Sequence, residues 1–95
     1  MRSLSRALVL HGRIQTTDAR ARELRRLAER LVTYAKKNTL VDRRNLSALL
    51  GRDVARKFMK EMEEKFSTRN GGYTRIIKQG SRRSDGAKLA IIEFV

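Results

Sequence analysis

The longest regular pattern in the chain is an apolar stripe of helical period between residues 18 and 37. Basic residues occupy the opposite side, so the pattern predicts an amphipathic helix over this range. Thr16 and Thr17 can cap its start, and Asn38 can end it in the left-handed conformation. The stripe consists of Leu24, Leu27, Ala28, Leu31, Tyr34 and Ala35.

A shorter apolar stripe at the start of the chain predicts a first helix from Ser3 to His11. Leu4, Ala7 and Leu8 fall at helical spacing within it, and Gly12 breaks the pattern. The sequence RIQTT that follows, residues 13–17, has the β-branched bias of a short strand.

Two more helices are expected in the middle of the chain. Thr39, with Asp42 three residues later, resembles a capping box and predicts a helix to about Leu50. Gly51 should stop that helix, and Asp53 can cap a fourth one. The apolar face of the fourth helix extends to residue 66.

The last part of the chain has the pattern of a β-hairpin. YTRIIK and KLAIIEFV are β-branched and aromatic runs, and the turn-forming sequence QGSRRSDG separates them. The fold class predicted is α+β, with about four helices packed against a small mixed sheet made of the short early strand and a C-terminal antiparallel hairpin. Nothing in the sequence resembles a linker, so residues 1–95 are expected to form one domain.

The charge of the chain points to a polyanionic partner. Lys and Arg number 23 against 10 Asp and Glu, which gives a net charge of +13. By count there are 16 arginines and 7 lysines, and the guanidinium group binds phosphate with two parallel hydrogen bonds where an ammonium acts as a point charge. This composition favours RNA or DNA as the partner.

Other classes of function find little support in the composition. The absence of cysteine excludes a disulfide framework and a thiolate zinc site, and favours an intracellular protein. No apolar run approaches the roughly 20 residues of a membrane span, and the first residues do not resemble a secretory signal. With His11 as the one histidine and carboxylates that look solvated, we expect no enzyme, no cofactor, no metal and no small-molecule substrate.

The stretch from Arg69 to Gly86 is the strongest candidate site but has two interpretations. Gly71 and Gly72 allow close approach of backbone amides to phosphate, and Tyr73 could stack on a base or donate from its hydroxyl. The plainer interpretation is a turn that leads into a strand, with the tyrosine packed in the core. Arginines and lysines surround the glycines in either case.

Two other basic segments invite competing interpretations. Arg22, Arg26 and Arg30 form a row that either binds an anion or is a solvated helix face. The helices around LLGRDV could form a helix-turn-helix of a free-standing DNA-binding regulator. The second of these helices carries four basic and three acidic residues between 56 and 65, and this near-neutral surface argues against a recognition helix.

Three sequence blocks together identify a family. HGRIQTT at residues 11–17, the Lys36-Lys37 end of the long helix, and RNGGYTRI at residues 69–76 with the closing AIIEFV resemble the bacterial-type large-subunit ribosomal protein of family seventeen. The resemblance spans nearly the whole chain. It implies an α+β domain that binds large-subunit ribosomal RNA, contacts neighbouring ribosomal proteins, has no catalytic activity and resides in the ribosome of a bacterial cytoplasm or an organelle.

The resemblance and the charge pattern together give the expected RNA contacts. The family motifs imply contacts, or a role in shaping the contacting loop, for Arg13, Arg69, Asn70, Gly71, Gly72, Tyr73 and Arg75. The remaining expected contacts are Arg2, Arg6, Arg22, Arg26, Lys36, Lys37, Lys78, Arg82 and Arg83. Two features depart from the family pattern: Gln15 stands where a glutamate is usual, and the sequence starts at MRSLSRAL where family members normally carry a strongly basic segment before the first helix.

Overall fold

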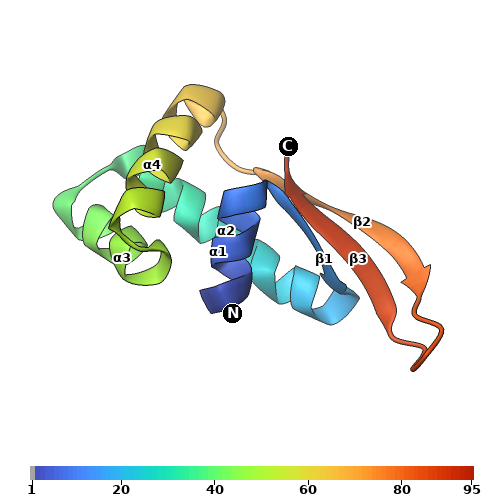
Figure 1. The fold of residues 1–95 in the computed structure, drawn as a ribbon. Coiled ribbons are helices and arrows are strands. Elements are labelled where there is room, and N and C mark those ends of the chain that lie inside the picture. Colours follow the sequence, from blue (N-terminus) through green and yellow to red (C-terminus); the bar gives the residue numbers. More distant parts are fainter. Residues whose placement is uncertain (1) are drawn as a thin grey trace.

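A computed structural model describes the backbone of residues 2–95 and the side chains of residues 3–95. The order of elements is α1 (Arg2–His11), β1 (Arg13–Thr17), α2 (Asp18–Lys37), α3 (Leu40–Leu50), α4 (Arg52–Phe66), β2 (Thr74–Ser81) and β3 (Lys88–Phe94). The predicted α+β fold class is confirmed (Figure 1). The predicted helices and strands all form, with boundaries within a residue or two of those expected, except that β2 continues three residues into the expected turn, to Ser81.

The three strands form one sheet in the order β1-β3-β2. Both pairings are antiparallel, so the expectation of a mixed sheet is corrected in this detail. The β2–β3 hairpin is antiparallel because a short turn joins its two strands, and β1 pairs antiparallel with the other edge of β3. Ile14, Ile92 and Ile76 lie across the sheet in one row and pack in a core cluster with side chains of α1 and α2.

Helix α2 has the caps that its sequence predicts. The Thr17 hydroxyl accepts a hydrogen bond from the Arg20 N–H at 3.3 Å. At the other end Asn38 adopts φ 53° and ψ 36°, and its N–H donates to the carbonyl of Tyr34. These local interactions fix where the helix begins and ends.

The two shorter helices begin in different ways. In α3 both hydrogen bonds of the capping box between Thr39 and Asp42 are present, as predicted. In α4 the prediction that Asp53 caps the helix is wrong. Gly51 occupies the cap position with φ 87°, no side chain caps the helix there, and Asp53 lies in the first turn instead. The glycine that stops α3 also starts α4, so no residue is left between them for a polar cap.

Two apolar clusters share α2 as their common wall. The first contains Leu31, Val32 and Ala35 of α2 with buried residues of α3, α4 and Tyr73. The second contains Ala21, Leu24 and Ala28 of α2 with Leu8 of α1 and the inner face of the sheet. The molecule is accordingly elongated, with extents of 45 × 26 × 17 Å, and Figure 1 shows the α3–α4 pair at one end and the hairpin turn at the other. No helix among residues 2–95 is long and apolar enough to cross a membrane.

Candidate nucleic-acid interface

The glycine loop, residues 69–73, is fastened to α2 through Tyr73. The backbone N–H of Tyr73 donates to both carboxylate oxygens of Glu29, at 3.0 and 3.1 Å. The tyrosine ring is only 5% exposed, and its centroid lies 5.1 Å from that of Phe66. Base stacking on Tyr73, one of the two roles considered from the sequence, is therefore excluded because the ring is part of the core.

Lys36 is a second fastening between α2 and the glycine loop. Its ammonium donates to the backbone carbonyl of Arg69 and to the hydroxyl of Tyr73, the latter at 3.1 Å. It also lies 5.2 Å from the centre of the tyrosine ring, and the tyrosine hydroxyl donates to the same Arg69 carbonyl at 2.9 Å. Lys37, its neighbour, is exposed. The sequence analysis predicted that both lysines contact RNA. In the structure Lys36 instead forms hydrogen bonds within the protein that hold the glycine loop.

The two glycines let the loop turn where a side chain would be strained. Gly71 and Gly72 have φ values of 141° and 62°, conformations that residues with a Cβ rarely adopt. The guanidinium of Arg69 curls back, with Nε donating to the carbonyl of Gly71 at 3.2 Å. Arg69, Asn70 and Gly72 are exposed on the surface of this loop, so an incoming phosphate can reach them.

A row of alternating charge crosses the sheet beside the glycine loop. Arg13 of β1, Glu93 of β3 and Arg75 of β2 are cross-strand neighbours. Glu93 is 2.6 Å from the Arg75 guanidinium and 3.8 Å from that of Arg13. One carboxylate between two guanidinium groups leaves a net positive charge, and both arginines are exposed. The pairing orients the two arginines without neutralising the row.

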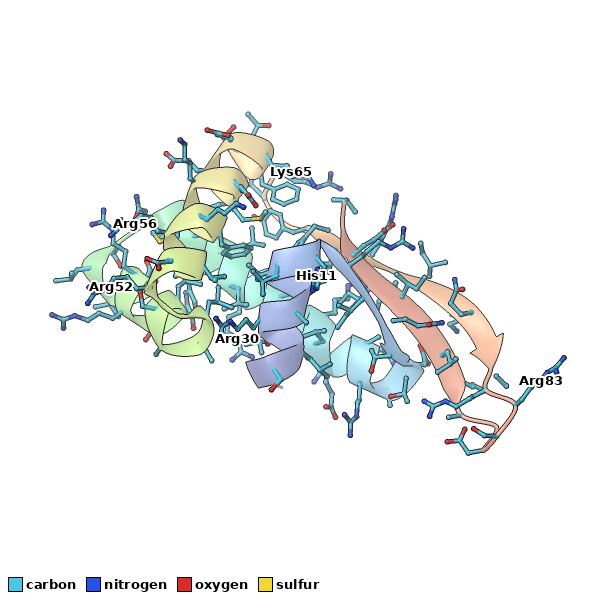
Figure 2. All side chains as sticks on the ribbon, in the orientation of Figure 1. His11, Arg30, Arg52, Arg56, Lys65 and Arg83 are labelled. Carbon is cyan, nitrogen blue, oxygen red and sulfur yellow. The ribbon has the colours of Figure 1, made fainter. Side chains whose placement is uncertain are left out.

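The turn of the β2–β3 hairpin is closed by its own backbone. The Arg82 N–H donates to the Ala87 carbonyl at 2.7 Å, and the Gly86 N–H donates to the Arg82 carbonyl at 2.8 Å. The Asp85 carboxylate accepts from the Ala87 N–H at 3.0 Å and lies 3.6 Å from the Arg82 guanidinium. Arg83 points away from the body of the molecule at this far end (Figure 2).

The remaining predicted contacts are spread over the surface. Lys78 lines a hollow of about 250 Å³ with Asp18 and Lys88 beside the turn of the hairpin, and Arg22 pairs with Asp18 at 3.5 Å. Arg26 is exposed on α2. Arg6 is exposed as well but borders a different hollow, between α1 and the end of α3. The side chain of Arg2 lies outside the described residues.

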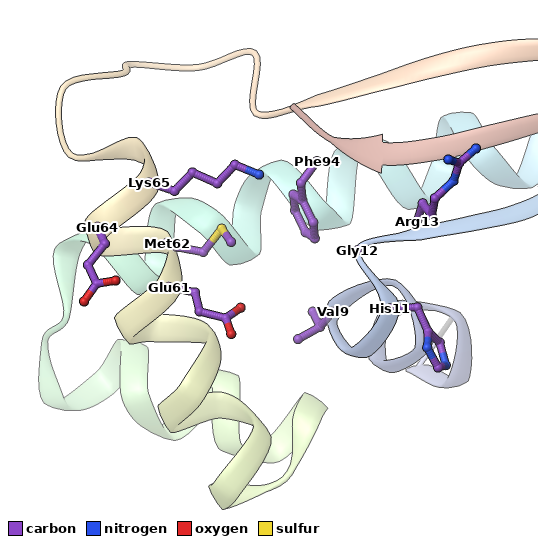
Figure 3. A pocket seen from close by; sticks show the side chains of 9 residues that line it. All are labelled: Val9, His11, Gly12, Arg13, Glu61, Met62, Glu64, Lys65 and Phe94. Atoms are coloured by element: carbon purple, nitrogen blue, oxygen red, sulfur yellow. The ribbon is translucent and has the colours of Figure 1, made fainter.

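A further hollow, of about 600 Å³, lies between the end of α1 and α4 (Figure 3). Its rim carries both signs of charge, with Glu61 directed towards α1 and Lys65 reaching towards Phe94, while His11 and Arg13 point away from α4. Such a mixed rim does not suit a polyanion. Among residues 2–95 no group of three or more histidines and carboxylates is arranged to hold a metal ion.

Glu29 is the site residue that the sequence analysis missed. Its carboxylate anchors a loop 44 residues further along the chain. The available signal was its position beside the apolar stripe, next to Ala28. An acid that borders the buried face of a helix often meets a backbone N–H of another element.

The fold and this surface define a class: a small basic α+β protein that presents arginines on a glycine loop, a sheet face and a hairpin turn. The family model for ribosomal protein L17 matches residues 1–95, and the chain belongs to this family. The resemblance found in the sequence is thus confirmed, and with it the expectation that the protein is a structural component rather than an enzyme.

Individual relatives agree over the full length of the chain. It is 47% identical over 96 aligned residues to "Large ribosomal subunit protein bL17" of Natranaerobius thermophilus, covering 100% of this chain and 85% of the relative. Proteins of the same name from Fusobacterium nucleatum and Moorella thermoacetica are 48% and 45% identical, again over 100% of this chain, with 83% and 86% of the relative covered.

Proposed function

We propose that this protein is a structural constituent of the large ribosomal subunit that binds large-subunit ribosomal RNA and supports subunit assembly and translation. Its partners are that RNA and neighbouring large-subunit proteins, and it resides in the ribosome of a bacterial cytoplasm or an organelle. The relatives named as large-subunit proteins support this role. Family membership favours it over a free-standing helix-turn-helix regulator.

The observation that carries the RNA-binding proposal is that the glycine loop and hairpin combine a fixed backbone with exposed guanidinium groups. The Glu29 and Lys36 contacts hold the loop backbone in place, while Arg69, Arg75 and Arg83 remain exposed. A preorganised cationic surface binds the RNA backbone without first losing loop entropy. Binding is therefore by phosphate neutralisation and shape, because A-form RNA hides its major-groove edges.

The test is sedimentation of a tagged copy in a lysate, followed by filter binding of the purified protein to large-subunit RNA at several salt concentrations. We expect co-migration with the large subunit. The variant Arg82→Ala/Arg83→Ala should lower the slope of log affinity against log salt by about 1.4–1.8, since each lost phosphate contact removes about 0.7–0.9.

The matched control is Arg44→Ala/Lys57→Ala, which removes the same charge from exposed positions on α3 and α4. Its salt slope should stay close to that of the unaltered protein. A protein that remained at the top of the gradient at low salt, or a slope that fell equally in both double variants, would contradict the proposal.

A further inference from the structure

The basic and acidic residues of α4 lie on different sides of the helix, which its near-neutral net charge does not reveal. Arg52, Arg56 and Lys60 recur every four residues and line a groove shared with α3. The acids Glu61 and Glu64 line the hollow that α4 shares with α1 instead. A helix that appeared near-neutral in sequence therefore has one distinctly basic side.

The groove between α3 and α4 has a volume of about 430 Å³ and is walled by cations from both helices. Arg43 of α3 faces the row on α4, and its Nε donates to the Asn38 side-chain oxygen at 2.8 Å, which orients the guanidinium. Ala55 and Met59 contribute apolar surface. Against four basic residues the lining contains one acid, Glu63.

This arrangement is electrostatically unfavourable for the isolated protein. Like charges four residues apart on a helix repel each other, and Arg52 lies in the first turn of α4, where the helix dipole disfavours a cation. Arg52, Arg56 and Lys60 make no ion pair with the other residues whose side chains the structure describes. A bound anion would relieve both sources of repulsion.

We propose that the α3–α4 groove, lined by Arg43, Arg52, Arg56 and Lys60, binds a second segment of RNA sugar-phosphate backbone. The row from Arg52 to Lys60 extends about 12 Å along the helix axis, which is too long for one phosphate group and suits a run of them. Three of the four cations are arginines, which bind phosphate oxygens with two hydrogen bonds. The apolar floor offers a surface for a ribose or the face of a base.

The groove and the hairpin turn lie at opposite ends of the molecule. In Figure 2 Arg52 and Arg56 project from the end formed by α3 and α4, and Arg83 projects from the other. The long dimension of the protein is 45 Å. One RNA segment could therefore contact both the groove and the hairpin turn only by running along the full length of the protein. The protein thereby bridges two RNA segments, which gives the proposed assembly role a physical basis.

This inference rests on the proposed function, and hydroxyl-radical footprinting on large-subunit RNA tests it separately. The unaltered protein should protect two separate RNA segments. Arg52→Ala/Arg56→Ala should lose one of them and lower the salt slope by about 1.4–1.8. Arg82→Ala/Arg83→Ala should lose the other segment, and the control Arg44→Ala/Lys57→Ala should retain both.

Two results would overturn the inference. If Arg52→Ala/Arg56→Ala gave the same footprint and slope as the control, the groove would have no RNA, as would be the case if it held an acidic protein segment. If the unaltered protein protected no RNA, the proposed function would fail along with it. Arg52→Gln/Arg56→Gln, which keeps a polar side chain with an apolar stem but removes the charge, should reproduce the alanine result, and thermal unfolding monitored by circular dichroism checks that each variant is folded.

Discussion

The glycine loop at residues 69–73 and the hairpin turn at residues 82–87 are both basic and glycine-containing, yet they are held in opposite ways. The glycine loop is held by residues of other elements. Glu29 binds the Tyr73 N–H, Lys36 binds the Arg69 carbonyl, and Phe66 packs on the Tyr73 ring. The second is closed by hydrogen bonds within its own residues. Around the glycine loop a basic residue, Lys36, makes contacts that hold the loop in place. In the hairpin turn Arg82 makes only an exposed ion pair with Asp85, and Arg83 points away from the molecule (Figure 2).

A basic residue in a motif predicted to bind RNA is therefore not necessarily an RNA contact. Lys36 and Lys37 are adjacent in the chain, but one fastens the loop and the other is exposed. We therefore expect changes at the glycine loop to act first on stability, and changes at the hairpin turn to act almost entirely on binding.

The largest effect on stability should come from Tyr73→Ala. Removing a buried aromatic ring that packs on Phe66 should lower the free energy of unfolding by about 3–5 kcal/mol, measured by urea denaturation. Tyr73→Phe keeps the ring and loses only the hydroxyl, so its cost should be about 1 kcal/mol. Equal costs for the two variants would mean that the hydroxyl, not the packing, fixes the loop.

Glu29→Ala should have the next largest effect. The change leaves the Tyr73 N–H without its carboxylate acceptor, and a hydrogen bond to a charged group contributes about 1.5–3 kcal/mol. Glu23→Ala removes the same charge from an exposed site on the same helix and should stay within about 0.5 kcal/mol. Hydrogen exchange at the Tyr73 amide should accelerate in the first variant alone, and unchanged exchange there would contradict the fastening role.

Lys36 and Lys37 allow the same test, of a structural role against an RNA contact, on two adjacent residues. Lys36→Ala removes the donor to the Arg69 carbonyl and the Tyr73 hydroxyl and should cost about 1–2 kcal/mol of stability. Lys37→Ala should leave stability unchanged within about 0.5 kcal/mol and lower the salt slope of RNA binding by about 0.7–0.9. Urea denaturation and filter binding on both variants measure the two quantities, and a reversed pattern would refute the assignment.

Features that depend on contacts between residues close in the chain could be predicted from the sequence, whereas those that depend on distant residues could not. The caps at Thr17, Asn38 and Thr39 were predictable because each depends on residues within four positions. The Asp53 cap failed because Gly51 already serves both helices. The glycine loop could be located from its motif, but whether Tyr73 faces RNA or the core could not, since its partners lie in α2 and α4, far away in the chain.

The distribution of charge around α4 is a surface feature that likewise could not be predicted from the sequence. The near-neutral balance of charge on α4 was correct from the sequence, although the count left out Arg52 and Asp53. The side of the helix on which each charge lies matters only once α1 and α3 are in place beside it. The net charge of an element therefore predicts its interactions poorly when its neighbours lie on different sides. The contrast between the two hollows that α4 borders could be seen only in three dimensions.

The smallest effect on stability should come from Asp85→Ala in the hairpin turn. The ion pair with Arg82 is 3.6 Å long and exposed, so its loss should cost about 0–1 kcal/mol of the free energy of unfolding. Because Asp85 also accepts from the Ala87 N–H, hydrogen exchange at that amide should accelerate while exchange at Tyr73 stays the same. The variant should bind RNA slightly more tightly, since it frees the Arg82 guanidinium and removes a negative charge from the turn. Weaker binding would mean that the shape of the turn, rather than its free charge, governs the contact, and the contrast between the two loops would then be one of degree.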